Sequence, residues 1–401
     1  MHDARPEVAQ PLAEREHWVS SEVVTIIVAQ IVFGLGWSLY LLTPKFLATA
    51  LGAGPELIGR TNAAGGVAGV LLVPIAAVGI DRFGRKLFFR AGSLLVVIVS
   101  LGYMHVHAVG WPIFVLQGCI AAAFGLAFNA NAALLADWAP PSRLGQAIGW
   151  LGAANVLTNA VSTSVAEPLA THYGWNAVFG LGVALGSTAL ALSFFLQPAP
   201  ARAGHPSHAG AAAERFDRLA LTQILCATAL IGAVFAALFV FVQPYALSLG
   251  AHEVHGFFLG FTVSAVACRL LLGGLGDRLG RRRVAVFMCV AYAVSALLTR
   301  HLDPTRLWLD GLVFGAAHGL LYPTLNALVL ETVPSSRRGF GMAFYNGAFN
   351  AGTALSSLGW GWLAQQHGFP LVYAVACCIA LLAAAVLAAA PGRRAASRLS
   401  A

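Results

Sequence analysis

Residues 219–242 read LALTQILCATALIGAVFAALFVFV and contain no charged side chain. Residues 23–42 and 371–390 are similarly long and also lack charged side chains. An α-helix rises about 1.5 Å per residue, so about 20 residues cross the roughly 30 Å hydrocarbon core of a bilayer. These three stretches therefore predict membrane-spanning helices.

The whole chain has the composition of a membrane protein. Of its 401 residues, 10% are charged and 58% are hydrophobic, and the mean hydropathy is +0.76. A soluble protein carries about 25% charged residues, so we exclude a soluble enzyme, a nucleic-acid-binding protein and a disordered chain. The apolar runs also lack the period of two that marks the strands of a membrane barrel. The predicted fold class is an all-α membrane protein.

Breaks at charged, proline-containing and glycine-rich positions divide the chain into twelve predicted transmembrane helices. Their approximate ranges are 22–43, 57–79, 87–106, 110–135, 144–169, 176–196, 219–243, 253–275, 284–299, 307–330, 339–364 and 371–390. We predict an N-terminal six-helix bundle at 22–196 and a C-terminal one at 219–390. The other predicted segments are a cytoplasmic N-terminal segment at 1–21, a cytoplasmic linker at 197–218 and a cytoplasmic tail at 391–401.

The positive charges predict the orientation. If both termini are cytoplasmic, 19 of the 24 Lys and Arg residues lie in inner segments, and the four in outer segments are Lys45, Arg60, Arg300 and Arg306. Cytoplasmic loops of membrane proteins carry such an excess, so the net charge of +8 indicates topology and not a nucleic-acid partner. We expect a monomer in the lipid bilayer of a bacterial inner membrane.

The sequence offers no chemistry of an enzyme or a metal site. The six cysteines lie in apolar runs without the spacing of a zinc site, and we expect them to be buried apolar residues. No G-x-x-x-x-G-K-[ST] motif is present, so the chain has no nucleotide site of that kind. We expect no cofactor, no metal and no catalytic residue.

An internal repeat relates the two halves of the chain. Residues 81–85, DRFGR, recur as residues 277–281, DRLGR. In the same alignment Gly125 corresponds to Gly319, and Asp137 corresponds to Glu331. Six helices have therefore been duplicated in parallel.

The two repeated loops resemble the signature loop of the major facilitator superfamily, G-x-x-x-D-[RK]-x-G-[RK]-[RK]. The second copy matches throughout residues 273–282, and the first has Ala77 where the family has its first glycine. The resemblance covers roughly residues 20–392. It implies two pseudo-symmetric bundles that rock about a central site near the membrane midplane, so that the site opens alternately to each side.

The resemblance also implies a cytoplasmic latch. In this chain its residues would be Asp81, Arg82, Gly84, Arg85 and Asp137 in the first half and Asp277, Arg278, Gly280, Arg281 and Glu331 in the second. We expect Arg85 to lie near Asp137, Arg281 to lie near Glu331, and both glycines to form tight turns.

Polar side chains at membrane depth are costly unless they face a cavity or a partner, so they are the candidate solute-binding residues. His318, Tyr322 and Asn326 follow one another at i, i+4 steps and share one helix face. Arg269 lies about 12 Å inside the membrane and must face water, a carboxylate or an anionic solute. The full set is Gln30, Trp37, Tyr40, Asn129, Gln223, Arg269, His318, Tyr322 and Asn326.

Three titratable residues are candidate proton carriers: His318, Asp310 and Glu167. His318 lies near the midplane of its predicted helix, and the two carboxylates lie near outer helix ends, where side chains are usually hydrated. The sequence departs from a known proton-coupled drug-exporter pattern, because Phe114 occupies the position where such exporters carry an arginine.

We therefore expect a secondary transporter that moves a small organic solute by alternating access, with proton-coupled export of a metabolite or xenobiotic as the first hypothesis. Two alternatives remain open at this stage. One is an importer or facilitator of the same fold, and the other is a transporter-like sensor that binds a ligand without moving it.

Overall fold

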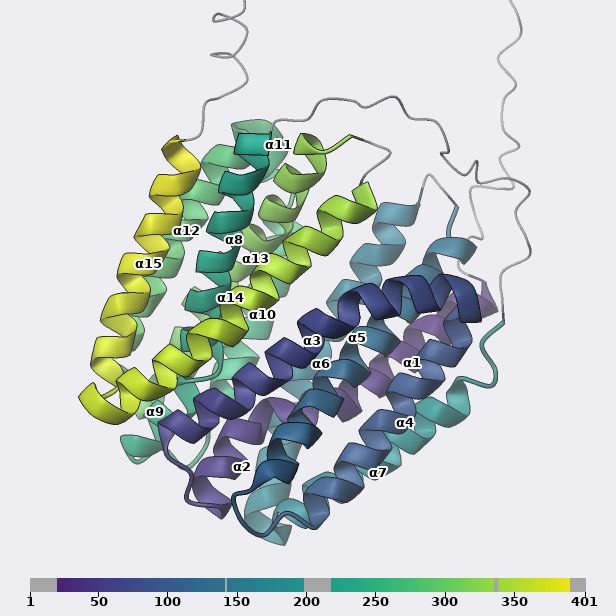
Figure 1. Ribbon diagram of the computed structural model, residues 1–401, viewed down its shortest axis with the longest axis horizontal. Helices are drawn as coiled ribbons and strands as arrows, with labels where there is room; N and C mark the ends of the chain where they lie inside the picture. Colours follow the sequence, from purple (N-terminus) through teal and green to yellow (C-terminus); the bar gives the residue numbers. More distant parts are fainter. Residues whose placement is uncertain (1–19, 141–142, 198–217, 335–337, 390–401) are drawn as a thin grey trace, which may run out of the picture.

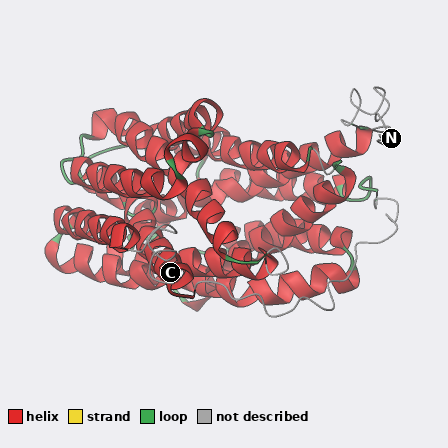
Figure 2. Cartoon of the chain, turned by 90° about the horizontal axis from the view of Figure 1, so that it is seen from above, coloured by secondary structure: helices red, strands yellow, loops and turns green. Residues whose placement is uncertain are grey.

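The computed structural model describes residues 20–140, 143–197, 218–334 and 338–389, without the side chains of residues 73–78, 81, 145, 338 and 339. Within these ranges every regular element is a helix (Figure 2). The predicted terminal segment, linker and tail fall almost wholly outside the described residues.

The N-terminal half folds into six helical passes, here called the N-bundle. Its elements are α1 (Ser21–Ser38), η2 (Leu39–Leu42), α2 (Thr43–Ala50), α3 (Pro55–Phe83), α4 (Arg85–Met104), α5 (Trp111–Trp138), α6 (Leu144–Tyr173) and α7 (Trp175–Leu192). The first three form one pass, in which a short 3-10 segment joins two α-helices. Pro44 is tolerated because it lies in the first turn of α2, where its missing N–H leaves no bond unmade.

The C-terminal half repeats this arrangement as the C-bundle. Its elements are α8 (Arg218–Phe239), α9 (Val242–Ser248), α10 (His255–Leu272), α11 (Leu275–Leu279), α12 (Arg281–Thr299), η3 (Pro304–Arg306), α13 (Leu307–Thr332), α14 (Arg338–His367) and α15 (Phe369–Ala389). Here α8 and α9 form the first pass, as α1, η2 and α2 do in the N-bundle.

The described residues thus form six passes in each bundle, and the long helices of each bundle lie side by side (Figure 1). Among the described residues, nine are long and apolar enough to span a membrane by length and hydropathy alone. The other three are α3, α6 and α14, which contain 29, 30 and 30 residues. These three contact the opposite bundle. The fold class predicted from the sequence is therefore confirmed.

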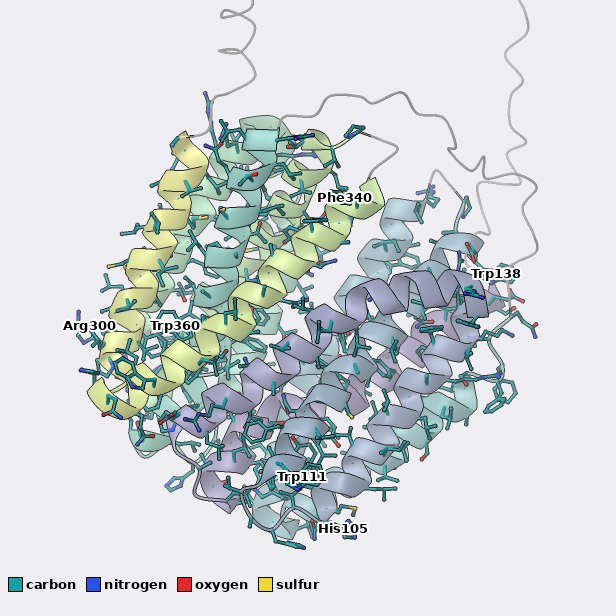
Figure 3. The ribbon with its side chains drawn as sticks, in the orientation of Figure 1. His105, Trp111, Trp138, Arg300, Phe340 and Trp360 are labelled. Atoms are coloured by element: carbon teal, nitrogen blue, oxygen red, sulfur yellow. The ribbon has the colours of Figure 1, made fainter. Side chains whose placement is uncertain are left out.

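The molecule has two ends, which we name by the course of the chain. The terminal end is where α1 begins, α15 ends and α11 lies, and the distal end is where α2 and α9 lie (Figure 1). Trp138 and Phe340 lie toward the terminal end, and Trp111 and His105 lie at the distal end (Figure 3). Aromatic residues at both ends match the aromatic belts of membrane proteins.

The outer faces of the helices are apolar and exposed. Leu270 and Leu271 of α10 are 78% and 80% exposed, and Phe287 of α12 is 68% exposed. Such faces would contact lipid tails. The expectation that all cysteines are buried holds fully only for Cys289. Cys226 and Cys378 are exposed, and the other three are partly exposed.

Glycines form the tight turns between α3 and α4 and between α11 and α12. Gly84 and Gly280 both have a φ of 91°, a backbone conformation that side chains with a Cβ rarely adopt. The two copies of the repeated loop therefore share the same local geometry.

Glycines also allow α10 and α13 to touch along their backbones. A Cβ at Gly311, Gly315 or Gly319 of α13 would lie 2.1, 2.2 or 2.7 Å from a carbonyl oxygen of α10. The three glycines are spaced at i, i+4 steps on one face of α13, the small-residue pattern that lets membrane helices approach closely. We call them the glycine seam.

Candidate functional site

In the described part of the chain the two bundles meet mainly where α3 contacts α14, where α6 contacts α10 and where α2 contacts α9. Asn62 Nδ2 donates to Ser357 Oγ at 2.8 Å, and Gln243 Nε2 donates to the Leu41 carbonyl at 2.9 Å. These contacts gather toward the distal end, whereas the bundles spread apart toward the terminal end (Figure 1). The structure is therefore closed at its distal end.

Glu167 of α6 is the centre of the distal closure. Its carboxylate forms an ion pair with Lys45 of the same bundle. It also accepts hydrogen bonds from the C-bundle: from the backbone N–H of Val254 at 2.8 Å, and from the N–H and Nδ1 of His255 at 2.7 and 2.8 Å. Lys45 Nζ itself donates to the His252 carbonyl at 2.6 Å. We call Lys45, Glu167, Val254 and His255 the distal lock.

The distal lock is dry. The side chain of Glu167 is 0% exposed and that of Lys45 is 8% exposed, so the expected hydrated position of Glu167 is wrong. Breaking a buried ion pair by removing one partner typically costs about 3–5 kcal/mol. The hydrogen bonds that Glu167 and Lys45 form with the C-bundle join the two bundles at this end.

Ion pairs at the terminal end connect helices within each bundle. Arg85 pairs with Asp137 and also donates to the Ala133 carbonyl at 2.7 Å. Arg281 pairs with Glu331 at 3.0 Å and with Asp277 at 2.8 Å. The structure thus brings together the two pairs that the resemblance to the signature loop implies. Arg82 and Arg278 are exposed, and the side chain of Asp81 lies outside the described ones.

The face of α13 that carries His318, Tyr322 and Asn326, here called the inner stripe, is built into the C-bundle. His318 Nδ1 lies 2.5 Å from the Tyr292 hydroxyl, and the Tyr322 hydroxyl donates to Asn346 Oδ1 at 3.1 Å. Tyr322 and Asn326 are partly exposed, whereas His318 is 9% exposed.

Aromatic rings surround His318. The ring centroids of Phe235, Tyr322, Phe261, Phe314 and Phe349 lie 5.0–6.3 Å from that of the imidazole. These rings come from α8, α10, α13 and α14. At such distances offset and tilted ring pairs are favourable, so the rings stabilise the packing around His318.

Arg269 lies in the last turn of α10, beside the inner stripe. Its Nε donates to the Gly319 carbonyl at 3.3 Å, and its charge acts on Tyr292, His318, Tyr322 and Tyr345. Among the described residues no carboxylate pairs with it. The side chain is partly exposed.

The predicted N-bundle residues fall into two groups. Gln30 and Tyr40 are buried and bonded inside the bundle, Gln30 to Asn131 at 3.1 Å and Tyr40 to Ser100 at 2.6 Å. Trp37 is partly exposed and its ring is tilted against that of Phe124, with centroids 4.5 Å apart, while Asn129 is exposed. The first group is thus part of the packed interior of the bundle, and the second lies at its surface.

Two predicted residues remain to be placed. Gln223 of α8 is partly exposed, and its Oε1 atom is buried without a hydrogen-bond partner in the described structure. Asp310, near the distal start of α13, is partly exposed and accepts a hydrogen bond from Thr299 at 3.2 Å.

Sequence reasoning missed the cross-bundle partners of Glu167. Lys45 appeared only as an outer charge, and His255 was not identified as a candidate. The available signal was a lone lysine and a lone glutamate near the outer ends of helices in one half. Nothing in the sequence shows that a third group from the other half joins them.

Comparison with known proteins agrees with this architecture. The profile of the Major Facilitator Superfamily matches residues 26–266 and 224–400. The multi-drug resistance efflux pump PmrA of Streptococcus pneumoniae is 27% identical over 374 residues, which cover 87% of this chain and 91% of the relative. The multidrug resistance protein MdtG of Serratia proteamaculans is 28% identical over 317 residues, covering 75% of each chain.

Solved structures share the fold. A mutant form of the nucleoside transporter NupG superposes with a TM-score of 0.78 at 14% identity, covering 92% of this chain and 99% of that one. The inward open xylose transporter XylE from E. coli gives a TM-score of 0.73 at 14% identity, with 92% and 95% covered. With the family profile matching both halves, the chain is a multi-pass membrane transporter that belongs to the Major Facilitator Superfamily.

Proposed function

We propose that this transporter exports a small organic solute across a bacterial inner membrane by alternating access, as a monomer. The observation that carries the proposal is the asymmetric contact between the bundles, joined at the distal lock and spread apart at the terminal end. Such a contact can be exchanged for its mirror arrangement when the bundles rock. The outward direction draws support from two relatives named as a multidrug efflux pump and a multidrug resistance protein.

The proposal places the terminal end in the cytoplasm. The described Arg and Lys residues of the loops and helix ends support this, because they concentrate at that end. In that orientation the structure faces inward, ready to take up solute from the cytoplasm. The ion pairs of Arg85 and Arg281 would then stiffen the loops of the cytoplasmic latch, which must close when the distal end opens.

Flux measurements test the proposal directly. Purified protein in liposomes is expected to speed the movement of a fluorescent aromatic dye under an imposed membrane potential or pH gradient, relative to protein-free liposomes. Dye that binds the protein without any increase in flux under either gradient would contradict export and favour a sensor. Flux that runs only into the compartment facing the terminal end would instead favour an importer.

We also propose that transport is coupled to proton movement, and that His318 carries the proton. Asp310 and Glu167 lie near the distal end, whereas His318 lies farther along α13, toward the middle of that helix. The groups facing His318 are Tyr292 of α12, Tyr322 of α13 and Arg269 of α10. None of these is a carboxylate that would hold the imidazole permanently charged.

Replacing His318 with glutamine is expected to make dye flux insensitive to a pH gradient at fixed membrane potential, while exchange at equilibrium continues. The amide keeps a hydrogen bond to Tyr292 but cannot carry a proton near neutral pH. The measurement compares initial flux rates at several external pH values. Tyr292→Phe is the complementary control, because it removes the hydrogen bond between residues 292 and 318 and keeps the imidazole, so its pH response should persist. An unchanged pH response in His318→Gln would refute the role.

A further inference from the structure

We propose that Arg269 anchors a negatively charged group of the transported solute, so that the site takes small organic anions that carry an aromatic ring. The inference rests on the proposed function and deepens it, since it names the substrate class of the same site. It starts from a cation inside the C-bundle that has no anionic partner among the described residues.

The protein itself offsets only part of this charge. The last turn of α10, where Arg269 lies, is the negative end of the helix dipole. The Gly319 carbonyl accepts one hydrogen bond, from Nε. An arginine presents five N–H donors in a planar fork that matches a carboxylate or a sulfonate, so most of its donors remain available.

The hydroxyl groups of the neighbouring tyrosines form hydrogen bonds with other groups of the C-bundle. The Tyr322 hydroxyl donates to Asn346, and the Tyr345 hydroxyl donates to the Tyr322 carbonyl at 2.7 Å. The Tyr292 hydroxyl is bonded to His318. Internal groups therefore hold these tyrosines in place, and in the described structure no hydrogen bond joins their hydroxyl groups to the guanidinium. No guanidinium nitrogen of Arg269 is both buried and without a hydrogen-bond partner in the described structure. Its remaining N–H donors therefore face accessible space.

The rings around His318 define the rest of the ligand. Tyr322, Phe235 and Phe349 are partly exposed and lie around His318 at centroid distances of 5.4, 5.0 and 6.3 Å. A flat aromatic body would stack against these rings while its acidic group reaches Arg269. An inside-negative membrane potential would also drive such an anion outward, in the direction of the proposed export.

Calorimetric titration of the purified full-length protein tests the inference with three matched probes. These are an aromatic carboxylate, its uncharged methyl ester and an aliphatic carboxylate of similar size. The wild type is expected to bind the aromatic carboxylate at least about tenfold more tightly than either other probe. Equal affinity for the carboxylate and its ester, or no binding of the carboxylate, would overturn the inference.

Two substitutions assign the preference to the residue. Arg269→Gln is expected to lose the tenfold preference while still binding the ester, and that retained binding shows that the variant is folded. Arg269→Lys keeps the charge without the fork and is expected to retain part of the preference. A glutamine variant that still prefers the carboxylate would contradict the assignment.

The outcomes also separate this inference from the proposed function. Flux of neutral or cationic dyes with no carboxylate binding would leave the exporter standing and remove the anion site. Carboxylate binding that depends on Arg269, with no flux of any probe, would leave the site standing and remove the exporter.

Discussion

Replacement of Glu167 by glutamine is expected to open the distal end and abolish net export. The variant keeps the size of the side chain but leaves the buried Lys45 without its counter-ion, and the amide NH₂ group then faces the N–H donors of Val254 and His255. When the distal end opens, water can solvate Lys45, so the penalty falls on the closed state alone. A loss of about 3 kcal/mol or more corresponds to a shift of about 100-fold toward the open state.

Cysteine labelling measures this shift. Thr262 of α10 is 2% exposed and donates to the Val156 carbonyl of α6 at the contact between the bundles. In a background without the native cysteines, Thr262→Cys is expected to react slowly with a membrane-impermeant maleimide from the distal side. Adding Glu167→Gln should speed that reaction strongly. Equal labelling rates with and without Glu167→Gln would refute the role of the distal lock.

Two further variants control for local disturbance. Glu253 is another carboxylate beside His255, with its Oε2 atom 3.6 Å from Nδ1, but its side chain is 62% exposed. Solvent screens such a pair, so Glu253→Gln should leave labelling unchanged. Lys45→Met added to Glu167→Gln removes the orphaned charge and should restore part of the closure, because replacing both members of a buried pair is far less harmful than replacing one.

Replacement of Gly315 by valine is expected to prevent the C-bundle from folding. The Cβ would lie 2.2 Å from the Phe261 carbonyl oxygen and 2.7 Å from the Phe261 Cα, both backbone atoms of α10. Because both atoms belong to the backbone of α10, no change of side-chain rotamer can relieve the clash. The two helices α10 and α13 must therefore separate along the glycine seam. Overpacking of this kind costs about 3 kcal/mol or more, and the yield of monodisperse protein and the melting temperature should both fall sharply.

Gly125→Val is the matched control. Gly125 of α5 is the repeat counterpart of Gly319 in the seam, yet a Cβ there meets nothing within 4 Å. The same substitution in the same fold should therefore leave the yield and the melting temperature nearly unchanged. A comparable loss in both variants would show that valine itself, and not the close helix contact, causes the damage.

Most of the fold could be predicted from the sequence, because the bilayer imposes a length and an apolar composition on each pass. The predicted ranges 144–169 and 284–299 fall within α6 and α12, although both helices extend beyond them. The prediction ended the first helix at residue 43, whereas that pass continues to Ala50. Lys45 and Pro44 suggested a loop there, but packing at the distal end outweighs the local signal by burying the lysine beside an acid.

The candidate site was only partly accessible to the same reasoning. Helical spacing placed His318, Tyr322 and Asn326 on one face because a helix has a fixed period. The resemblance to the family's signature loop placed Arg85 beside Asp137, and the repeat placed the matching pair in the second half. The distal lock obeys neither rule, since Lys45 and Glu167 are 122 residues apart and His255 is another 88 residues further on. Its geometry depends on how two separately folded bundles meet.

The hydrogen bonds from Val254 and His255 to Glu167 have a consequence for α10. Val254 is the N-cap position of this helix, and its side chain caps nothing. The carboxylate of the opposite bundle acts as the cap in its place, and loss of a helix cap costs about 1 kcal/mol. Each opening of the distal end should therefore fray the first turn of α10, and the re-formation of that turn should help to draw the bundles back together.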